Sequence, residues 1–286
     1  MKTVKQVSAD FSERLSSIYD VNEVNSLCMM VLENVVSISS AKIKAFPEKE
    51  ISTPDSEIIT NILTRLAPGE PIQYILGYTA FYGLTFKVNP SVLIPRPETE
   101  ELVDWVLSLV GNKHVTGGSI LDIGTGSGCI AVSVKKNLPG VSVSAIDISQ
   151  DALRIATENA ELNNTKVNFI LGDILNPQFE IEHSKFEIII SNPPYVTMDD
   201  KKQMHSNVTD FEPHTALFVP ENDPLVFYNA IADFASKNLE PGGLLFFEIN
   251  ENYGEQTVKL LNNKLFKNIE LRKDMSERNR MIKAVK

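Results

Sequence analysis

SILDIGTGSGCIAVSV, residues 119–134, joins a short apolar run to a helical pattern through three glycines spaced G-x-G-x-G. A strand that turns through glycines into a helix brings bare backbone N–H groups to a ligand, where the helix N-terminus favours negative charge. The residues expected to contact such a ligand are Gly124, Thr125, Gly126, Ser127 and Gly128. The spacing differs from the G-x-G-x-x-G of dinucleotide folds, and alone it also fits a plain strand-to-helix turn.

Two acids follow the next two predicted strands. The expected strand of residues 141–146 is followed directly by Asp147, about 20 residues beyond the glycines. An acid at this position is placed to hold a ribose diol. No Arg follows it closely, which argues against a 2′-phosphate. Residues 167–171 lead to Asp173, whose side chain can meet an adenine edge.

Residues 191–195, Ser-Asn-Pro-Pro-Tyr, follow another apolar run and predict a site for a planar nitrogen. The amide oxygen of Asn192 can accept one N–H of an NH2 group. Proline fixes the direction of neighbouring carbonyls, so the carbonyl of Pro193 can accept the second N–H, with Pro194 completing the rigid turn. The ring of Tyr195 can supply a flat face beside the acceptor.

These groups all lie at the C-terminal ends of successive predicted strands. Ligands of open α/β sheets bind outside those ends. The combined pattern therefore predicts an S-adenosylmethionine site with an NH2-bearing acceptor beside it.

At this point the sequence resembles the class I methyltransferases, and more narrowly the peptide chain release factor glutamine N5-methyltransferases. The runs that carry the resemblance are residues 93–100, 124–128, 145–149, 191–195, and 211–213 together with 216–218. The resemblance implies methyl transfer from S-adenosylmethionine to the N5 nitrogen of a protein glutamine. The implied acceptor is the Gly-Gly-Gln glutamine of bacterial release factors, through which the methyl group would modulate translation termination.

The expected fold is α/β, with a Rossmann-like, mostly parallel sheet and helices on both faces, because strands and helices alternate from residue 119 onward. The resemblance adds an antiparallel edge hairpin formed by residues 269–271 and 281–284. We expect a helical domain over residues 1–75, a β-hairpin linker over 76–95 and a methyltransferase domain over 96–286.

The N-terminal part carries apolar residues at helical spacing. The first expected stripe is Val21, Val24, Leu27, Cys28, Val31, Leu32 and Val35, and the second is Ile58, Ile59, Ile62, Leu63 and Leu66. Thr53 and Pro54 predict the start of the second helix. Such a bundle can serve stability alone, or it can bind a macromolecular acceptor, which is the function we expect.

Composition narrows the possible functions. The chain has 286 residues, 43% of them hydrophobic, and a net charge of −10 from 37 acids and 27 bases. This balance counts against a nucleic-acid-binding protein, which usually needs a basic face. Cys28 and Cys129 lie in apolar helical patterns and suggest a reducing compartment. We expect a cytoplasmic protein without a membrane segment or a metal, since the four histidines are scattered.

Several alternatives remain open from the sequence. Adenine N6 is also a planar NH2 group, so an adenine N6-methyltransferase acting on DNA or RNA is the main alternative, and a non-catalytic cofactor-binding protein is another. Residues 196–224 have little periodicity and are expected to form a lid or substrate-binding segment. We expect no tuned general base, although His205 or His214 lies in that segment. Within residues 93–100, Arg96, Glu98 and Glu100 fit either bracing of the site, contact with the acceptor protein or plain salt bridges.

Overall fold

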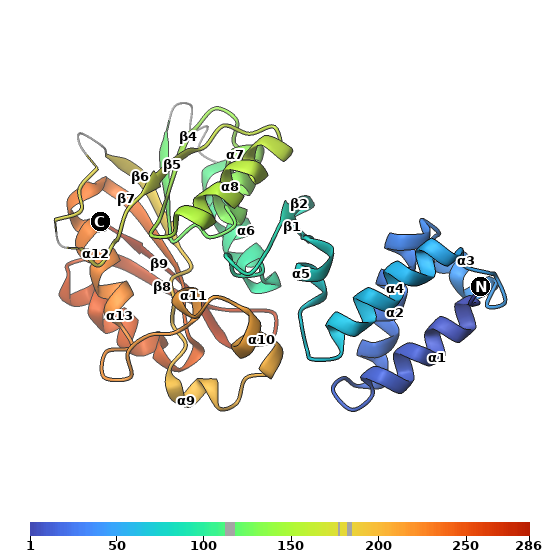
Figure 1. Cartoon of the computed structure of the whole chain (residues 1–286). Helices are drawn as coiled ribbons and strands as arrows, with labels where there is room; N and C mark the ends of the chain where they lie inside the picture. Colours follow the sequence, from blue (N-terminus) through green and yellow to red (C-terminus); the bar gives the residue numbers. More distant parts are fainter. Residues whose placement is uncertain (112–117, 177, 182–184) are drawn as a thin grey trace. The chain divides into compact units, whose positions relative to one another are not determined.

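The computed structural model describes residues 1–111, 118–176, 178–181 and 185–286, and these residues form two compact units (Figure 1). The smaller unit contains Met1–Leu76 and Ser206–Phe211, and the larger contains Gly77–His205 and Glu212–Lys286. Residues 206–211 fall within the expected methyltransferase domain of residues 96–286. Their contacts lie in the smaller unit because the Phe211 ring packs beside Gly69. The hairpin expected as a linker belongs with the larger unit.

The smaller unit is helical, and its apolar faces meet in one core. Its helices are α1 (Val4–Leu15), α2 (Val21–Val36), α3 (Ser40–Ala45), α4 (Thr53–Leu66), α5 (Ile72–Leu76) and α10 (Ser206–Phe211). The prediction of a buried stripe is wrong for two residues, because Val21 is 72% exposed and Ile58 is 50% exposed. Val21 is the first residue of α2 and lies before its buried face begins. The start of α4 is shifted by one residue, because the Ser52 hydroxyl, not Thr53, accepts the capping hydrogen bond from the backbone of Asp55.

The predicted hairpin forms from β1 (Tyr78–Phe81) and β2 (Leu84–Lys87). Tyr82 and Gly83 make the two-residue turn, both with positive φ (48° and 72°), as a hairpin that matches the strand twist requires. The hairpin is fixed to α8 (Gln150–Leu162). There the Asn159 amide accepts from the Lys87 N–H at 2.6 Å and donates to the Lys87 carbonyl at 3.0 Å.

A central sheet organises the larger unit, and within the described residues it has seven strands in the order β5-β4-β3-β6-β7-β9-β8. The strands are β3 (Ser119–Ile123), β4 (Ser142–Asp147), β5 (Asn168–Leu171), β6 (Phe186–Ser191), β7 (Leu239–Glu248), β8 (Lys267–Lys273) and β9 (Asn279–Val285). Pairs from β5 to β7 are parallel, and β9 pairs antiparallel with both β7 and β8. The predicted mostly parallel sheet with an antiparallel edge is confirmed.

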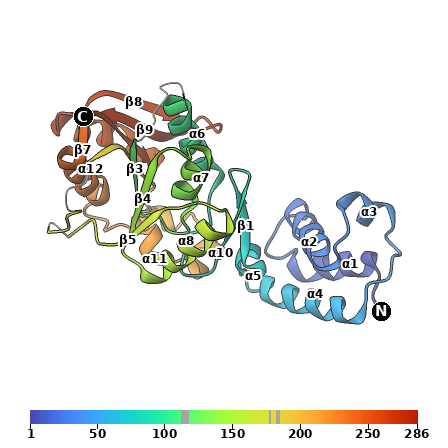
Figure 2. The ribbon, with the colours of Figure 1, turned by 90° about the horizontal axis from the view of Figure 1, so that it is seen from above.

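Helices cover both faces of this sheet, as Figure 2 shows. One core joins α6 (Pro97–Gly111) and α7 (Cys129–Asn137) to the sheet, and the other joins α12 (Val226–Asn238) and α13 (Gly254–Asn263) to the opposite face. Trp105 of α6 lies in the first core, edge-on to Phe246 with ring centroids 5.4 Å apart.

The segment expected to be a loop after residue 195 contains short helices: α9 (Met198–Lys201), α10 and α11 (His214–Leu217). A backbone bridge closes this part of the chain on itself. Val196 donates to the Leu217 carbonyl at 2.9 Å and accepts from the Val219 N–H at 3.0 Å. The low periodicity of the sequence reflects helices too short to show a repeat.

Gly128 is required where the glycine-rich turn enters α7. Its φ is +80°, and a Cβ added there would lie 3.1 Å from the Cβ of Ala156 on α8. We expect Gly128→Ala to lower the free energy of unfolding by about 2–4 kcal/mol, the sum of left-handed strain and overpacking. Urea unfolding followed by the fluorescence of Trp105, the single tryptophan, measures this in the larger unit.

Gly140→Ala is the matched control. An added Cβ at Gly140 has no neighbour within 4 Å, and its φ lies outside the left-handed range. This variant is expected to stay within about 0.5 kcal/mol of the wild type. Equal stability of the two variants would contradict the close approach of α7 to α8.

Candidate active site

A cavity of about 390 Å³ lies at the carboxyl edge of the parallel strands, in the larger unit. This volume is in the range of small-molecule sites. The predicted site residues that line it are Gly124, Gly126, Asp147, Asp173, Asn192, Pro193 and Pro194. The residues come from the ends of β3, β4, β5 and β6, so the structure brings the separate sequence signals to one place.

The glycine-rich turn contributes open space to this cavity. Gly124 and Gly126 have positive φ (75° and 54°), and a Cβ built on either meets no atom within 4 Å. A side chain there would project into the room that a ligand needs. The turn therefore fits a bound adenosyl group by its shape and its lack of side chains.

The expectation of bare N–H groups along this turn is wrong for four of its five residues. Gly124 and Thr125 both donate to the Ile146 carbonyl, Gly126 donates to the Asp147 carboxylate, and Gly128 donates to the Thr125 carbonyl. These bonds tie β3 to β4 and hold the turn in place. They leave little of the turn's backbone for anion binding, which agrees with a cofactor that brings no phosphate.

Three residues of the turn lie behind the cavity and are not among its lining residues. The Thr125 hydroxyl donates to the buried carboxylate of Asp122 at 2.6 Å, and Ser127 is also buried. Burial raises the pKa of Asp122 to about 7, although the hydrogen bond from Thr125 opposes the shift. Thr125 and Ser127 thus support the turn from within, Gly128 allows α8 to approach, and cofactor contact by these three stays a prediction.

Asp147 occupies the tip of β4 and faces the cavity. Its Oδ2 accepts from the Gly126 N–H at 2.8 Å, and its Oδ1 accepts from the Ser149 N–H at 2.9 Å. Burial raises the pKa of Asp147, while the hydrogen bonds from Ser149 and Gly126 lower it. Each carboxylate oxygen keeps a lone pair for a further donor, so the group is oriented to accept two hydroxyls of a ribose.

Asp173 follows β5 and also lines the cavity. Its Oδ1 accepts from the Leu175 N–H at 2.8 Å, which fixes the side chain in one orientation. The neighbouring Ile174 and Leu175 give this end of the cavity an apolar wall suited to a flat ring.

Asn192 follows β6, whose end is held to β3 by a hydrogen bond from the Ser191 hydroxyl to the Ile123 carbonyl at 2.6 Å. The Asn192 amide donates through Nδ2 to the Thr99 hydroxyl at 3.1 Å. No described residue donates a hydrogen bond to Oδ1 of Asn192 or to the carbonyl of Pro193. Both oxygens are therefore available as acceptors at the cavity wall.

Tyr195 is not among the residues that line the cavity. Its hydroxyl donates to Oε1 of Glu248 at 3.1 Å, and its carbonyl accepts from the Asn250 amide at 3.1 Å. Burial and the charge of Glu248 raise the pKa of this phenol far above its usual range. The structure gives Tyr195 a buried hydroxyl contact, and the expected contact of its ring with an acceptor stays a prediction.

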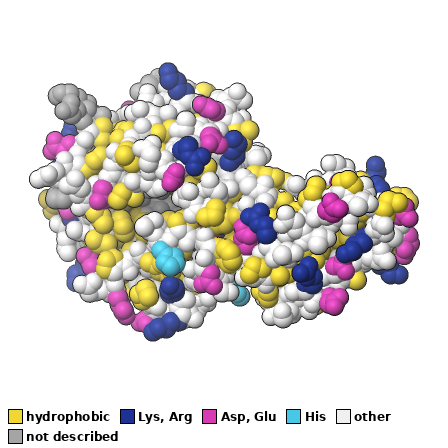
Figure 3. Space-filling model, in the orientation of Figure 1, with side chains coloured by type: hydrophobic (Ala, Val, Ile, Leu, Met, Phe, Trp, Pro, Cys, Tyr) yellow, Lys and Arg dark blue, Asp and Glu magenta, His cyan; other side chains and the backbone are white. Residues whose placement is uncertain are grey.

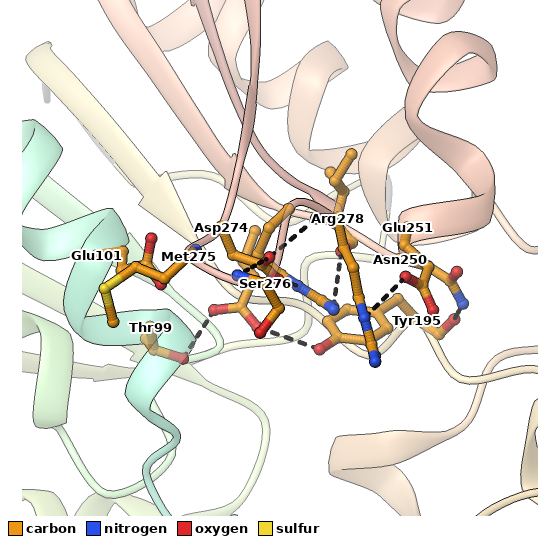
Figure 4. A network of polar contacts seen from close by, with 12 residues as sticks. Thr99, Glu101, Tyr195, Asn250, Glu251, Asp274, Met275, Ser276 and Arg278 are labelled. Carbon is orange, nitrogen blue, oxygen red and sulfur yellow. Dashed lines mark hydrogen bonds and ion pairs between the residues drawn. The ribbon is translucent and has the colours of Figure 1, made fainter.

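Two residues that were not predicted from the sequence contact the predicted site residues. Thr99 at the start of α6 contacts Asn192, and Glu248 at the end of β7 contacts Tyr195. The Thr99 hydroxyl donates to Oε2 of Glu248 at 2.7 Å. Figure 4 shows Thr99 and Tyr195 approaching one carboxyl group from opposite sides. A signal was present, because an acid inside the apolar run of residues 244–249 is costly to bury without hydrogen-bonding partners.

Two charged residues of the run 93–100, Arg96 and Glu100, make contacts within the larger unit. Arg96 forms an ion pair with the buried carboxylate of Glu212, which also accepts from the Ile94 N–H at 3.1 Å. Glu100 accepts from the Tyr82 N–H at 2.8 Å in the hairpin turn. The pair holds the chain that continues from Glu212 into the cavity-lining residues 213–220.

His205 and His214 are the two histidines of residues 196–224. His205 and His214 are both exposed, and neither lines the cavity. His114 and His183 lie outside the described residues. The part of the chain that the structure describes contains no cluster of three or more His, Cys, Asp and Glu placed to hold a metal ion.

Lys and Arg side chains lie interspersed with Asp and Glu on the face of the larger unit that Figure 3 shows. None of the helices in the described ranges combines the length and the apolar character that a membrane crossing requires.

The fold and the cavity define a class I, S-adenosylmethionine-dependent methyltransferase. Residues 105–210 match the methyltransferase small domain family, and residues 6–77 match the PrmC N-terminal domain. The chain is 45% identical to a release factor glutamine methyltransferase of Flavobacterium psychrophilum, over 98% of each chain. It is 41% identical to one of Bacteroides thetaiotaomicron, over 98% of this chain and 99% of the relative. The chain belongs to the release factor glutamine methyltransferase family.

Solved structures agree at the level of the fold. A methyltransferase from Pyrococcus furiosus aligns with a TM-score of 0.51 at 16% identity, covering 82% of this chain and 98% of that one. A T. thermophilus 16S rRNA methyltransferase aligns with a TM-score of 0.53 at 20% identity, covering 73% of this chain and 49% of that one. At these identities the likeness concerns the architecture alone.

Proposed function

We propose that this protein methylates the side-chain N5 of the Gly-Gly-Gln glutamine in bacterial peptide chain release factors. The relatives that match nearly the whole chain are named release factor glutamine methyltransferases. The observation that carries the proposal is the orientation of Asn192, whose NH2 group is engaged by Thr99 while its oxygen is left for an acceptor. An adenine N6-methyltransferase would use a similar NH2 site, but the relatives do not favour that alternative.

The chemical difficulty is the poor nucleophilicity of an amide nitrogen. Its lone pair is delocalised, and full loss of that resonance would cost roughly the amide rotation barrier, about 18–20 kcal/mol. When bound, S-adenosylmethionine supplies a methyl carbon activated by a positively charged sulfur. As the N–C bond forms and the C–S bond breaks, the acceptor nitrogen gains positive charge and then releases a proton to solvent.

The protein's contribution is to hold that nitrogen. Oδ1 of Asn192 and the Pro193 carbonyl each accept one N–H of the acceptor NH2. Both hydrogen bonds strengthen as the nitrogen becomes positive, so they favour the transition state over the ground state. Each is worth roughly 1.5–3 kcal/mol when its donor is charged. Alignment of the nitrogen with the methyl carbon can lower the barrier by about 7–11 kcal/mol more, so positioning dominates.

The smaller helical unit is proposed to bind the release factor. A small-molecule acceptor would need only the cavity, whereas a glutamine inside a folded protein needs a surface that holds the rest of that protein. The match of residues 6–77 to a domain family that accompanies the methyltransferase domain supports this role. For a release factor substrate we expect activity in the cytoplasm and no direct binding of nucleic acid.

A labelling assay tests the acceptor directly. The protein is incubated with radiolabelled S-adenosylmethionine and, in parallel, with a release factor, the same factor carrying alanine in place of the Gly-Gly-Gln glutamine, and duplex and single-stranded nucleic acid. Label is expected in the unmodified release factor alone. Label in nucleic acid, or equal label in the alanine variant, would overturn the proposed acceptor.

A further inference from the structure

Glu248 is a buried carboxyl group that binds two hydroxyl groups next to the acceptor site. It ends β7, is 1% exposed, and accepts two hydroxyl hydrogen bonds, from Thr99 at 2.7 Å and from Tyr195 at 3.1 Å. An ionised carboxylate is an acceptor only, so both hydroxyls must direct their hydrogens toward it. Glu248 thereby holds Thr99 and the last residue of the 191–195 run at the same time.

This arrangement sets the direction of the next hydrogen bond. A hydroxyl has one hydrogen, and that of Thr99 is already donated to Glu248. Towards Asn192, Thr99 can only accept, so it takes the NH2 side of the amide at 3.1 Å. The Asn192 oxygen is left on the side away from Thr99, as an acceptor in the wall of the cavity.

The surroundings of Glu248 bear on its ionisation. Burial raises the pKa of Glu248, whereas the hydrogen bonds from Thr99 and Tyr195 and the charge of Arg280 lower it. Arg280 is itself held by Asp274 at 3.1 Å, and Glu98 is the nearby charge that acts in the opposite direction. The hydroxyl of Tyr228 donates to the backbone carbonyl of Glu248 at 3.4 Å. The two hydroxyl donors and the cation oppose the effect of burial, and the net shift of the Glu248 pKa is upward.

We propose that Thr99 and Glu248 are positioning residues that select the reactive orientation of the Asn192 amide. The inference deepens the proposed function and rests on it. In the opposite orientation the Asn192 NH2 would face the NH2 of the acceptor, donor against donor, and the site would repel its substrate. The two consecutive hydrogen bonds, from Thr99 to Glu248 and from Asn192 to Thr99, prevent this inversion.

Three variants test these two hydrogen bonds. Thr99→Val keeps the shape and removes the hydroxyl, and we expect kcat to fall about 10- to 100-fold, the equivalent of one lost charge-assisted hydrogen bond. Thr99→Ser restores the hydroxyl and is expected to recover most of that loss. Glu248→Gln can donate to Thr99, which frees the Thr99 hydrogen to point at the Asn192 oxygen and invert the amide. Its kcat is expected to fall as far as that of Thr99→Val.

The affinity for S-adenosylhomocysteine separates positioning from general damage, and it is expected to stay within about threefold in all three variants. Thr257→Val is the matched control, since Thr257 is a fully buried threonine of α13 whose hydroxyl donates to the Tyr253 carbonyl at 2.8 Å. Its loss of stability should resemble that of Thr99→Val, while its kcat stays within about twofold of the wild type.

A double variant, Thr99→Val with Glu248→Gln, gives the sharpest result. Because both residues act through Asn192, its kcat is expected to equal that of either single variant. Losses that multiply, or a Thr99→Val enzyme with wild-type kcat, would overturn the inference while the wild type still methylates release factor. A wild type that labels no glutamine would instead overturn the proposed function, and the inference with it.

Discussion

Replacing Asn192 by alanine is expected to lower kcat for glutamine methylation by at least about 100-fold, the effect of removing one preorganised transition-state hydrogen bond. The nitrogen would then be held by the Pro193 carbonyl alone and would sample orientations out of line with the methyl carbon. Affinity for S-adenosylhomocysteine should stay within about tenfold, because the loss concerns the acceptor. Single-turnover methylation of a release factor measures the rate, and calorimetry measures the affinity.

Asn168→Ala is the control for this experiment. Asn168 is an exposed residue of β5 and does not line the cavity, so its removal should leave the rate within about twofold of the wild type. Turnover that survives in the Asn192 variant would remove the basis for the acceptor site described here.

The Asp147→Ala variant is expected to bind S-adenosylhomocysteine about 100-fold more weakly. Two hydroxyl hydrogen bonds to the carboxylate would be lost, each worth roughly 1.5 kcal/mol or more. The same change removes the acceptor for the Gly126 N–H, so the glycine-rich turn also loses an anchor at the cavity. Titration calorimetry with S-adenosylhomocysteine gives the dissociation constant.

Asp151→Ala is the matched control, because the Asp151 side chain is 71% exposed on α8 and is absent from the cavity lining. Its dissociation constant should equal that of the wild type. If the Asp147 variant also bound with unchanged affinity, the ribose would have to be held by other residues.

Much of the architecture could be predicted from the sequence because the patterns are local. A few neighbouring residues are enough to predict the backbone conformation of the glycine-rich turn, of the apolar runs and of the Tyr82-Gly83 turn. The carboxyl ends of parallel strands share one edge, so the meeting of Asp147, Asp173 and Asn192 also followed from the sequence.

The features that could not be predicted from the sequence are contacts between residues far apart in the chain. The N–H groups of the turn at residues 124–128 looked free because their acceptors, among them the Ile146 carbonyl, lie on the neighbouring strand. Glu248 meets Thr99 across 149 residues of sequence, and no local pattern joins the two. The placement of residues 206–211 beside Gly69 is likewise a tertiary contact.

The most direct test is a crystal structure with S-adenosylhomocysteine and a peptide that contains the Gly-Gly-Gln glutamine. The proposed acceptor geometry predicts the glutamine side-chain nitrogen about 2.9–3.2 Å from both Oδ1 of Asn192 and the Pro193 carbonyl, in line with the sulfur. An Asn192 amide that presents its NH2 to the peptide, or a glutamine bound elsewhere, would contradict it.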